Sequence, residues 1–249
     1  MGPLTSRFRR PRTEVLVSAH RMGSGGDRSR ENSLEALEAA VGLGVDFVEF
    51  DVWRREDGTF VVAHDREHDT GLEYDAVLAA LAGHAGAHID LKFTSPAAAY
   101  RESTAWEVEA ARRAVEVLGH RHMIVTTGDD RAVRAVRDWG EAQGLDLVVG
   151  LSLGRSVKRL SWLRRIDIRR SELFPHPRIR RSGANLVVAH HTLARLGVAA
   201  YARRRQLPLL VWTVDSEESL RYWLRPGRAW LVTTNHPGRA LEMRSRLSR

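Results

Sequence analysis

Short β-branched segments alternate with amphipathic segments along the chain, and this alternation restricts the possible folds more than any other feature. Strands that alternate with helices predict a parallel sheet whose strands are joined by crossover helices. The expected strands are Val15–Ala19, Phe47–Trp53, His88–Phe93, Met123–Thr127, Leu145–Leu151, Ala184–Ala189, Leu207–Val214 and Trp230–Thr233. The expected helices between them include Ser33–Leu43, Ser103–Leu118, Arg131–Gln143 and Leu193–Arg205.

Eight such strands in a chain of 249 residues favour a single-domain (β/α)8 barrel, the TIM barrel. A doubly wound open sheet is the alternative architecture. An additional strand, Thr59–Ala63, follows the turn Glu56-Asp57-Gly58 and predicts a small hairpin after the second strand. We expect residues 1–13 to form a flexible basic leader and residues 14–249 to form the barrel domain.

The composition excludes some classes of site. There are no cysteines, so disulfides and thiolate metal sites are excluded, and the chain suits a reducing cytoplasm, which is the location we expect. No apolar run approaches the length needed to cross a bilayer. The net charge of +8 comes almost entirely from arginine, since Lys92 and Lys158 are the only lysines.

Arginines are densest between Arg155 and Arg181, where Trp162, Leu163 and Phe174 lie among them. This segment follows the fifth main strand, on the side where barrel enzymes place their βα loops. Three interpretations remain open: a solvated helical face, a rim that contacts anionic lipid or a large phosphorylated substrate, and a nucleic-acid surface. Nucleic acid is not expected as a partner, because no nucleic-acid-binding motif accompanies the arginines.

Carboxylates lie near the ends of two strands. Glu49 and Asp51 are two residues apart and face the same way, as do Asp90 and Lys92 on the next main strand. The carboxyl ends of barrel strands meet in one mouth, where three converging carboxylates would repel one another unless protonated or bridged by a cation. Oxygen ligands favour one hard divalent ion, Mg²⁺ or Ca²⁺. The alternative is a structural ion-pair network with arginines.

Histidines stand at the ends of two other strands. His20 follows the first strand and His64 follows the hairpin strand. Because imidazole titrates near neutrality, the pair suits a general acid and a general base. Arg21 can offer a forked donor to phosphate oxygens, or pair with Glu49 or Asp51.

Four further residues are candidates for the pocket. Trp212 ends the seventh main strand, where it could form a wall of the pocket or pack in the core, and His190 ends the sixth. For His190, packing in the core or at the surface is the favoured interpretation. Glu31 and Asn32 precede a helix, and Asn32 could either cap the helix, with Glu35 at the reciprocal position, or face the site.

Taken together, these segments resemble the glycerophosphodiester phosphodiesterase family. The resemblance rests on the stretch from His20 to Asp65, which contains HRM, REN, FVEFDVW and DGTFVVAHD, and it continues through IDLK, LLVWTVD and TTNHP. It implies a TIM barrel that hydrolyses phosphodiesters of glycerol, with one divalent cation, and releases an alcohol and glycerol 3-phosphate. The expected substrate is a small glycerophosphodiester or a lysolipid.

The resemblance also implies roles for individual residues. His20 and His64 match the acid/base histidines, Glu49 and Asp51 match metal ligands, and Asp90 stands where the family usually has a glutamate ligand. Arg21 and Lys92 match phosphate-binding positions, and Trp212 matches the tryptophan near the glycerol. In this family the neighbouring hydroxyl of the substrate attacks phosphorus.

The chain departs from the family pattern at three positions and in one segment. Met22 replaces a glycine, Arg30 replaces a proline, Asp90 is one methylene shorter than glutamate, and the segment between His64 and Asp90 is short. Two alternatives are open. One, supported by the arginine-rich segment, is a related barrel acting on lysophospholipids or sphingomyelin, as phospholipase D-like enzymes do. The other, suggested by Met22 and Arg30, is a catalytically silent barrel that binds phosphate.

Overall fold

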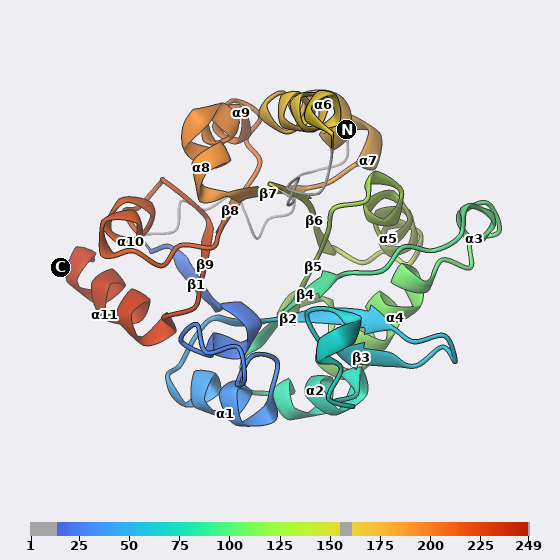
Figure 1. The fold of residues 1–249 in the computed structure, drawn as a ribbon, viewed down its shortest axis with the longest axis horizontal. Helices are drawn as coiled ribbons and strands as arrows, with labels where there is room; N and C mark the ends of the chain where they lie inside the picture. The colour runs from blue at the N-terminus through green and yellow to red at the C-terminus, as the bar shows by residue number, and fades with distance from the viewer. Residues whose placement is uncertain (1–13, 155–160, 249) are drawn as a thin grey trace.

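Eight parallel strands close into a barrel in the computed structural model, which describes residues 14–154 and 161–248 (Figure 1). Closure comes from β1, which pairs in parallel with both β2 and β9. The barrel strands are β1 (Leu16–Ala19), β2 (Phe47–Arg54), β4 (Gly86–Leu91), β5 (Met123–Thr127), β6 (Val148–Leu153), β7 (Leu186–His190), β8 (Leu209–Trp212) and β9 (Leu231–Thr234). The predicted TIM barrel is therefore confirmed, and the open sheet is excluded.

The predicted hairpin is present as well. The short strand β3 (Phe60–Val62) pairs antiparallel with residues Val52–Arg54 of β2, outside the closed barrel. In Figure 1 the two strands project together beyond the ring of barrel strands. Residues near the end of β2 thus belong partly to the barrel and partly to a hairpin at its edge.

Helices surround the barrel (Figure 1). They are α1 (Leu34–Gly42), α2 (Tyr74–Leu81), α3 (Ala97–Arg101), α4 (Trp106–Leu118), α5 (Asp130–Ala142), α6 (Trp162–Leu173), α7 (His176–Ser182), α8 (His191–Leu193), α9 (Ala199–Arg204), α10 (Glu217–Trp223) and α11 (Pro237–Leu247). Short helical turns are η1 (His20–Gly23), η2 (Arg66–His68), η3 (His120–His122) and the π-helical η4 (Ala194–Val198). None of the helices in the described ranges is long and apolar enough to cross a membrane.

Several predicted bounds are shifted by up to three residues, and two of the differences have a clear physical reason. The strand expected to begin at Leu145 begins at Val148, because the amide of Leu145 still bonds to the carbonyl of Gly140 in the preceding helix. The single helix expected over Leu193–Arg205 is divided into α8, η4 and α9. Gly197, with a φ of 140°, interrupts it, since that backbone conformation is incompatible with a continuous helix.

The apolar core has two parts. One fills the layer between the strands and the surrounding helices, where Trp223 and Tyr74 are among the largest fully buried side chains. The other fills the barrel interior and consists of Leu16, Phe47, Ile124, Val148, Leu186, Val188, Leu210 and Leu231. Inward-facing positions nearer the carboxyl ends of β2 and β4 are polar instead, and they form the candidate site. The predicted basic leader, residues 1–13, lies outside the described residues, and so do residues 155–160 of the arginine-rich segment.

Candidate functional site

Three carboxylates converge inside the mouth of the barrel. Glu49 and Asp51 come from β2, and the parallel register places Asp51 directly beside Asp90 of β4. One carboxylate oxygen of each residue lies within 4.8 Å of the others. Glu49 and Asp51 are almost completely buried, so their charges are poorly solvated and must be compensated within the protein.

Lys92 supplies part of that compensation. Its Nζ lies 3.0 Å from Asp51 Oδ1 and also contacts Asp90 Oδ2, while Thr126 Oγ1 donates to Asp90 Oδ1 at 2.8 Å. Burial alone would lower the pKa of Lys92, but Asp90 and Asp51 raise it above its ordinary value. Lys92 is therefore a fixed positive charge beside the carboxylates.

The pKa values of the two carboxylates on β2 shift in opposite directions. Burial would raise the pKa of Asp51, but Lys92, the hydrogen bond to His64 and the charge of Arg21 hold it well below its usual range. For Glu49, burial and the charges of Asp51 and Asp90 raise the pKa well above the ordinary value. If Glu49, Asp51 and Asp90 were all ionised, their three negative charges would exceed the two positive charges of Lys92 and Arg21.

A hard divalent cation fits this donor set. The ligands are three carboxylates, all supplied by rigid strands, and oxygen atoms are the ligands that Mg²⁺ and Ca²⁺ prefer. The raised pKa of Glu49 marks the excess negative charge that a cation would neutralise in place of a proton. The acidic cluster could therefore hold an ion, although its donor atoms do not distinguish Mg²⁺ from Ca²⁺.

Arg21 connects the two sides of the mouth. Its backbone is in the left-handed region, with a φ of 45°, which turns the guanidinium inward. Its amide donates to Glu49 Oε2 at 2.6 Å, Nη1 donates to Glu31 Oε2 at 2.6 Å, and Nε lies 3.3 Å from Asp51 Oδ2. Arg21 can therefore pair with carboxylates and also bind phosphate. Its Nη1 and Nε contact Glu31 and Asp51, while Nη2 lies beside His64.

His64 lies at the outer edge of the cluster. Its Nδ1 is 3.2 Å from Asp51 Oδ2, and 41% of its side chain is exposed. Trp53 holds the backbone of His64 in place, because its indole Nε1 donates to the His64 carbonyl at 2.8 Å. This half-exposed imidazole can exchange protons with a molecule that enters from solvent.

His20 is held from the opposite side. Its Nδ1 lies 2.8 Å from Asn235 Oδ1, and Asn235 Nδ2 donates to Asp215 Oδ2 at 2.8 Å. Since a carboxylate only accepts, the amide oxygen must face His20, and His20 Nδ1 must carry the hydrogen. Nε2 then presents its lone pair towards the mouth, 4.0 Å from Glu49 Oε2. Burial lowers the pKa of His20, which favours the neutral ring.

Three polar residues of this region were not identified from the sequence. Asn235 and Asp215 lie in the motifs TTNHP and LLVWTVD, and these motifs were the only indication in the sequence that they belong to the site.

The third residue, His88, lies inside the barrel between Ser18 Oγ at 3.3 Å and Thr126 Oγ1 at 3.2 Å. Burial lowers the pKa of His88 to about 4, so a neutral imidazole supports the floor of the carboxylate cluster.

Asn32 faces the site and does not cap the helix. Its Nδ2 donates to Asp51 Oδ2 at 3.2 Å, and its Oδ1 accepts from the Asp51 amide at 3.3 Å. The cap of α1 is Ser33, whose hydroxyl accepts from the Ala36 amide. The capping alternative for Asn32 is therefore wrong, and Glu35 pairs with Arg30 at 3.2 Å.

The departures at Met22 and Arg30 lie outside the mouth. Met22 adopts a left-handed φ of 65°, and its side chain is fully buried in the core between the barrel and the helices. Arg30 is half-exposed and reaches Glu35 at the surface. Neither substitution places a side chain among the carboxylates.

Trp212 and His190 are adjacent at the carboxyl ends of β8 and β7. Their ring centroids lie 5.6 Å apart in an edge-on arrangement, and the indole Nε1 of Trp212 is buried without a hydrogen-bond partner in the described part of the chain. His190 Nδ1 accepts from the Thr192 amide at 3.3 Å. These residues form the wall of the mouth across from the β2–β3 hairpin.

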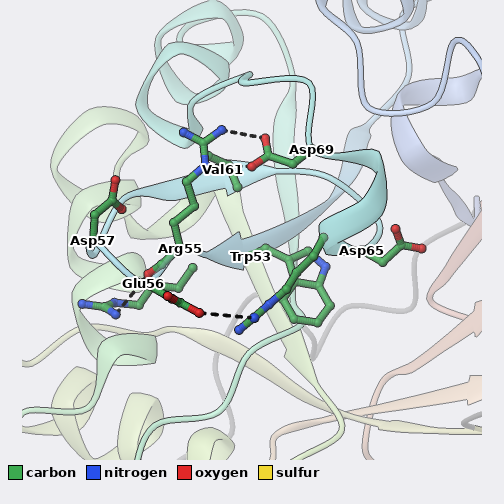
Figure 2. A pocket seen from close by; sticks show the side chains of 9 residues that line it. Trp53, Arg55, Glu56, Asp57, Val61, Asp65 and Asp69 are labelled. Carbon is green, nitrogen blue, oxygen red and sulfur yellow. Dashed lines mark hydrogen bonds and ion pairs between the residues drawn. The ribbon is translucent and has the colours of Figure 1, made fainter.

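A pocket of about 410 Å³ adjoins His64 on the hairpin. It is lined by Trp53, Arg54, Arg55, Glu56, Asp57, Val61, Asp65, Arg66 and Asp69. Figure 2 shows Arg55 reaching Asp69 on one side of this pocket, where the two form an ion pair of 2.7 Å. The pocket begins beside the catalytic candidate because Trp53 contacts the His64 carbonyl.

Known proteins resemble the chain in both sequence and fold. Residues 20–78 match the model of the glycerophosphoryl diester phosphodiesterase family. A search of curated protein sequences found no match.

Solved structures agree over nearly the whole chain. A protein of the glycerophosphoryl diester phosphodiesterase class from Silicibacter pomeroyi has a TM-score of 0.70 at 18% identity, covering 96% of both chains. A glycerophosphodiester phosphodiesterase from Parabacteroides distasonis has a TM-score of 0.70 at 17% identity, covering 93% of this chain and 98% of that one. An Oleispira antarctica phosphodiesterase in complex with the product sn-glycerol-3-phosphate has a TM-score of 0.61 at 16% identity, covering 92% of this chain and 96% of that one.

The matched segment, residues 20–78, contains His20, Glu49, Asp51 and His64, which the barrel brings to one mouth. The resemblance seen in the sequence is therefore confirmed: the chain matches the glycerophosphoryl diester phosphodiesterase family over residues 20–78, and it has the barrel fold of solved members of that family.

Proposed function

We propose that this protein is a phosphoric diester hydrolase that cleaves glycerophosphodiesters to an alcohol and glycerol 3-phosphate. The observation that carries the proposal is that two histidines, two cationic side chains (Arg21 and Lys92) and three carboxylates meet at one mouth of the barrel. The family match over residues 20–78 supports this reaction. The product bound by the Oleispira antarctica protein supports the glycerol phosphate half of the substrate.

The phosphate would bind between Arg21 and Lys92, whose charges are fixed by neighbouring carboxylates. When bound, a divalent cation held by Glu49, Asp51 and Asp90 would stabilise negative charge on the phosphoryl oxygens. Trp212 would contact the glycerol, and its unpartnered indole N–H could donate to a glycerol oxygen.

His20 and His64 would move the protons. His20 Nε2 carries a lone pair, so it would accept the proton of the glycerol hydroxyl that attacks phosphorus. His64 lies beside the hairpin pocket and would protonate the departing alcohol as its bond to phosphorus breaks. Water would then open the cyclic phosphate with the two roles reversed, so that each histidine regains its original state.

Release of the alcohol tests the proposal. Glycerophosphocholine, glycerophosphoethanolamine, glycerophosphoglycerol and lysophosphatidylcholine would be incubated with the protein and either Mg²⁺ or Ca²⁺. We expect divalent-dependent alcohol release that His20→Ala and His64→Ala each reduce by a factor of about 100 or more. His84→Ala, an exposed histidine after α2, is the matched control and should leave the rate unchanged.

Two outcomes would reject the mechanism: wild-type rates in both His20→Ala and His64→Ala, or phosphate binding without turnover of any substrate. The second outcome would identify a silent phosphate-binding barrel. Turnover of lysophosphatidylcholine alone would instead favour the lysophospholipid alternative, for which the apolar surface of α6 is a specific reason.

A further inference from the structure

The four most exposed large apolar side chains in the described ranges belong to α6, the residue that follows it, and η4. Trp162 is 67% exposed, Ile166 57%, Phe174 70% and Leu196 66%. Helix α6 packs against η4. The other large exposed apolar residues, Leu34, Leu43 and Val117, are 50% exposed or less and belong to the regions of α1 and α4. Contiguous exposed apolar surface on a protein marks an interaction site.

Spacing along α6 explains why these side chains share one face. Trp162, Ile166, Arg170 and Phe174 follow one another at four-residue intervals, so they lie along one side of the helix. Ile168 and Glu172 are buried on the side that faces the protein. The outward side therefore exposes aromatic and aliphatic groups that the barrel core does not use.

Arginines border this apolar stripe. A shallow groove of about 370 Å³ is lined by Arg165, Ile166, Arg169, Arg170, Leu173 and Phe174. The helix contains four arginines and only two acidic residues, Asp167 and Glu172. Glu172 is buried and forms an ion pair of 2.6 Å with Arg169. The exposed charge beside the apolar groups is thus mainly positive. We refer to Trp162, Arg165, Ile166, Arg170 and Phe174 as the α6 surface.

The α6 surface is at the same end of the barrel as the candidate site. Gly154, which follows β6, donates its amide to Glu172 Oε1 at 2.9 Å. Burial lowers the pKa of His190 at the end of β7, and the nearby charges of His191, Arg169 and Glu172 contribute less. These contacts place the last turn of α6 at the carboxyl ends of β6 and β7. Helix α7 packs against α5 instead, and Figure 1 shows α6 beside α9 on the outside of the ring of strands.

We propose that the α6 surface binds the surface of a bilayer that contains anionic phospholipids. Trp162, Ile166 and Phe174 would enter the boundary between headgroups and acyl chains, and Arg165 and Arg170 would contact lipid phosphates. Aromatic residues beside arginines are typical of helices that lie in a membrane interface. Because the patch is cationic as well as apolar, its charge complements an anionic lipid surface. The mouth of the barrel would then open close to the lipid headgroups.

Co-sedimentation with vesicles tests this proposal without requiring any enzymatic activity. We expect the full chain to sediment with vesicles of phosphatidylcholine and phosphatidylserine, to remain in solution with phosphatidylcholine alone, and to be released by added salt. The variant W162S/F174S should lose binding. Each of Arg165→Gln and Arg170→Gln should weaken it about fivefold.

The matched control is L43S/V117S, which removes two exposed apolar side chains from α4 and the end of α1 and should bind as the wild type does. His64→Ala should also bind normally, so failure of the proposed hydrolysis and failure of membrane binding are distinguishable. Circular dichroism checks that each variant is folded, and the arginine variants test the proposal even if W162S/F174S is unstable.

Two results would overturn the proposal. One is equal binding of the wild type and W162S/F174S to anionic vesicles. The other is wild-type protein that does not bind these vesicles but forms a dimer in size-exclusion chromatography that W162S/F174S abolishes. That result would assign the α6 surface to contact with a second copy of the chain.

Discussion

Asn235 accepts a hydrogen bond from His20 across the seam where the barrel closes, 215 positions away along the chain. The contact exists because β9 pairs with β1 in register, with Thr234 beside Ala19. Asp215 fixes the orientation of the Asn235 amide. The tautomer of His20 is therefore determined by Asn235, which follows β9, and Asp215, in the loop after β8.

Asn235→Ala should reduce kcat about tenfold, because the ring of His20 loses the hydrogen bond that orients it. Burial lowers the pKa of His20, whereas the bond to Asn235 raises it. Removing the bond should therefore lower this pKa further and move the acid limb of kcat/KM to lower pH. A pH–rate profile measures both effects.

Asp215→Asn provides the companion test. It removes the carboxylate that fixes the amide of Asn235, so its effect should be non-additive with that of Asn235→Ala in a double-mutant cycle. Full additivity would mean that Asp215 does not act through Asn235.

Glu49→Gln should make the metal-free protein more stable and abolish the stabilisation that divalent cations give to the wild type. The substitution removes a buried carboxylate whose pKa is raised by burial and by Asp51 and Asp90. It also removes one expected metal ligand. A cation that binds the native state but not the unfolded state stabilises the native state, so losing the ligand should remove this stabilisation. Melting temperatures with and without Mg²⁺ or Ca²⁺ test both effects.

The control for this experiment is Glu116→Gln, on the exposed face of α4. It should change neither the metal-free melting temperature nor the response to cations appreciably. An undiminished cation response in Glu49→Gln would exclude Glu49 as a ligand.

Trp53→Phe should lower kcat and raise KM for substrates with large alcohol groups more than for those with small ones. The indole both donates to the His64 carbonyl and lines the pocket beside that histidine. Phenylalanine keeps an aromatic face but removes the donor, at a cost of about 1 kcal/mol, or fivefold. Steady-state kinetics on a series of alcohols tests the expectation, and a uniform loss across the series would assign Trp53 a purely structural role.

The stability of the protein should decline as the pH falls from 6.5 towards 4. Burial lowers the pKa of His88 to about 4 from an ordinary value of 6.5, so in this range the unfolded chain binds a proton that the folded chain excludes. Stability rises with pH wherever the unfolded state binds more protons, and the full effect is about 3 kcal/mol.

Urea unfolding of the wild type and His88→Gln across this pH range measures the contribution of His88. The glutamine variant should show a shallower dependence on pH, because it has no group that titrates at this position. An identical pH dependence in the two proteins would contradict the expectation.

The sequence predicted those parts of the site that follow from local patterns. Alternating residues place Glu49 with Asp51, and consecutive parallel strands place Asp90 beside them. It did not predict Asn235 and Asp215, since their position depends on the closure of β9 onto β1. The role of Asn32 was left open because Asn32 and Ser33 are both good caps, and only the tertiary contact with Asp51 distinguishes them.

Helix α6 was also beyond local prediction. Its arginines and aromatics are visible in the sequence, but they do not reveal that α6 packs against η4 while α7 packs against α5. The contact between Glu172 and Gly154 that holds α6 at the rim joins residues from two different elements. The roles predicted for the individual site residues stay predictions until the variants are measured.

The hairpin of β2 and β3 has a consequence for how this barrel can change. Because β3 pairs with β2 outside the closed barrel, insertions or exchanges in residues 55–69 need not disturb the strand register that aligns the carboxylates. The two histidines proposed to move protons are therefore attached differently: His20 lies at the seam of the barrel, whereas His64 follows β3 in the hairpin. Transplanting residues 55–69 between distant relatives should exchange preferences for the departing alcohol while preserving the chemistry at phosphorus.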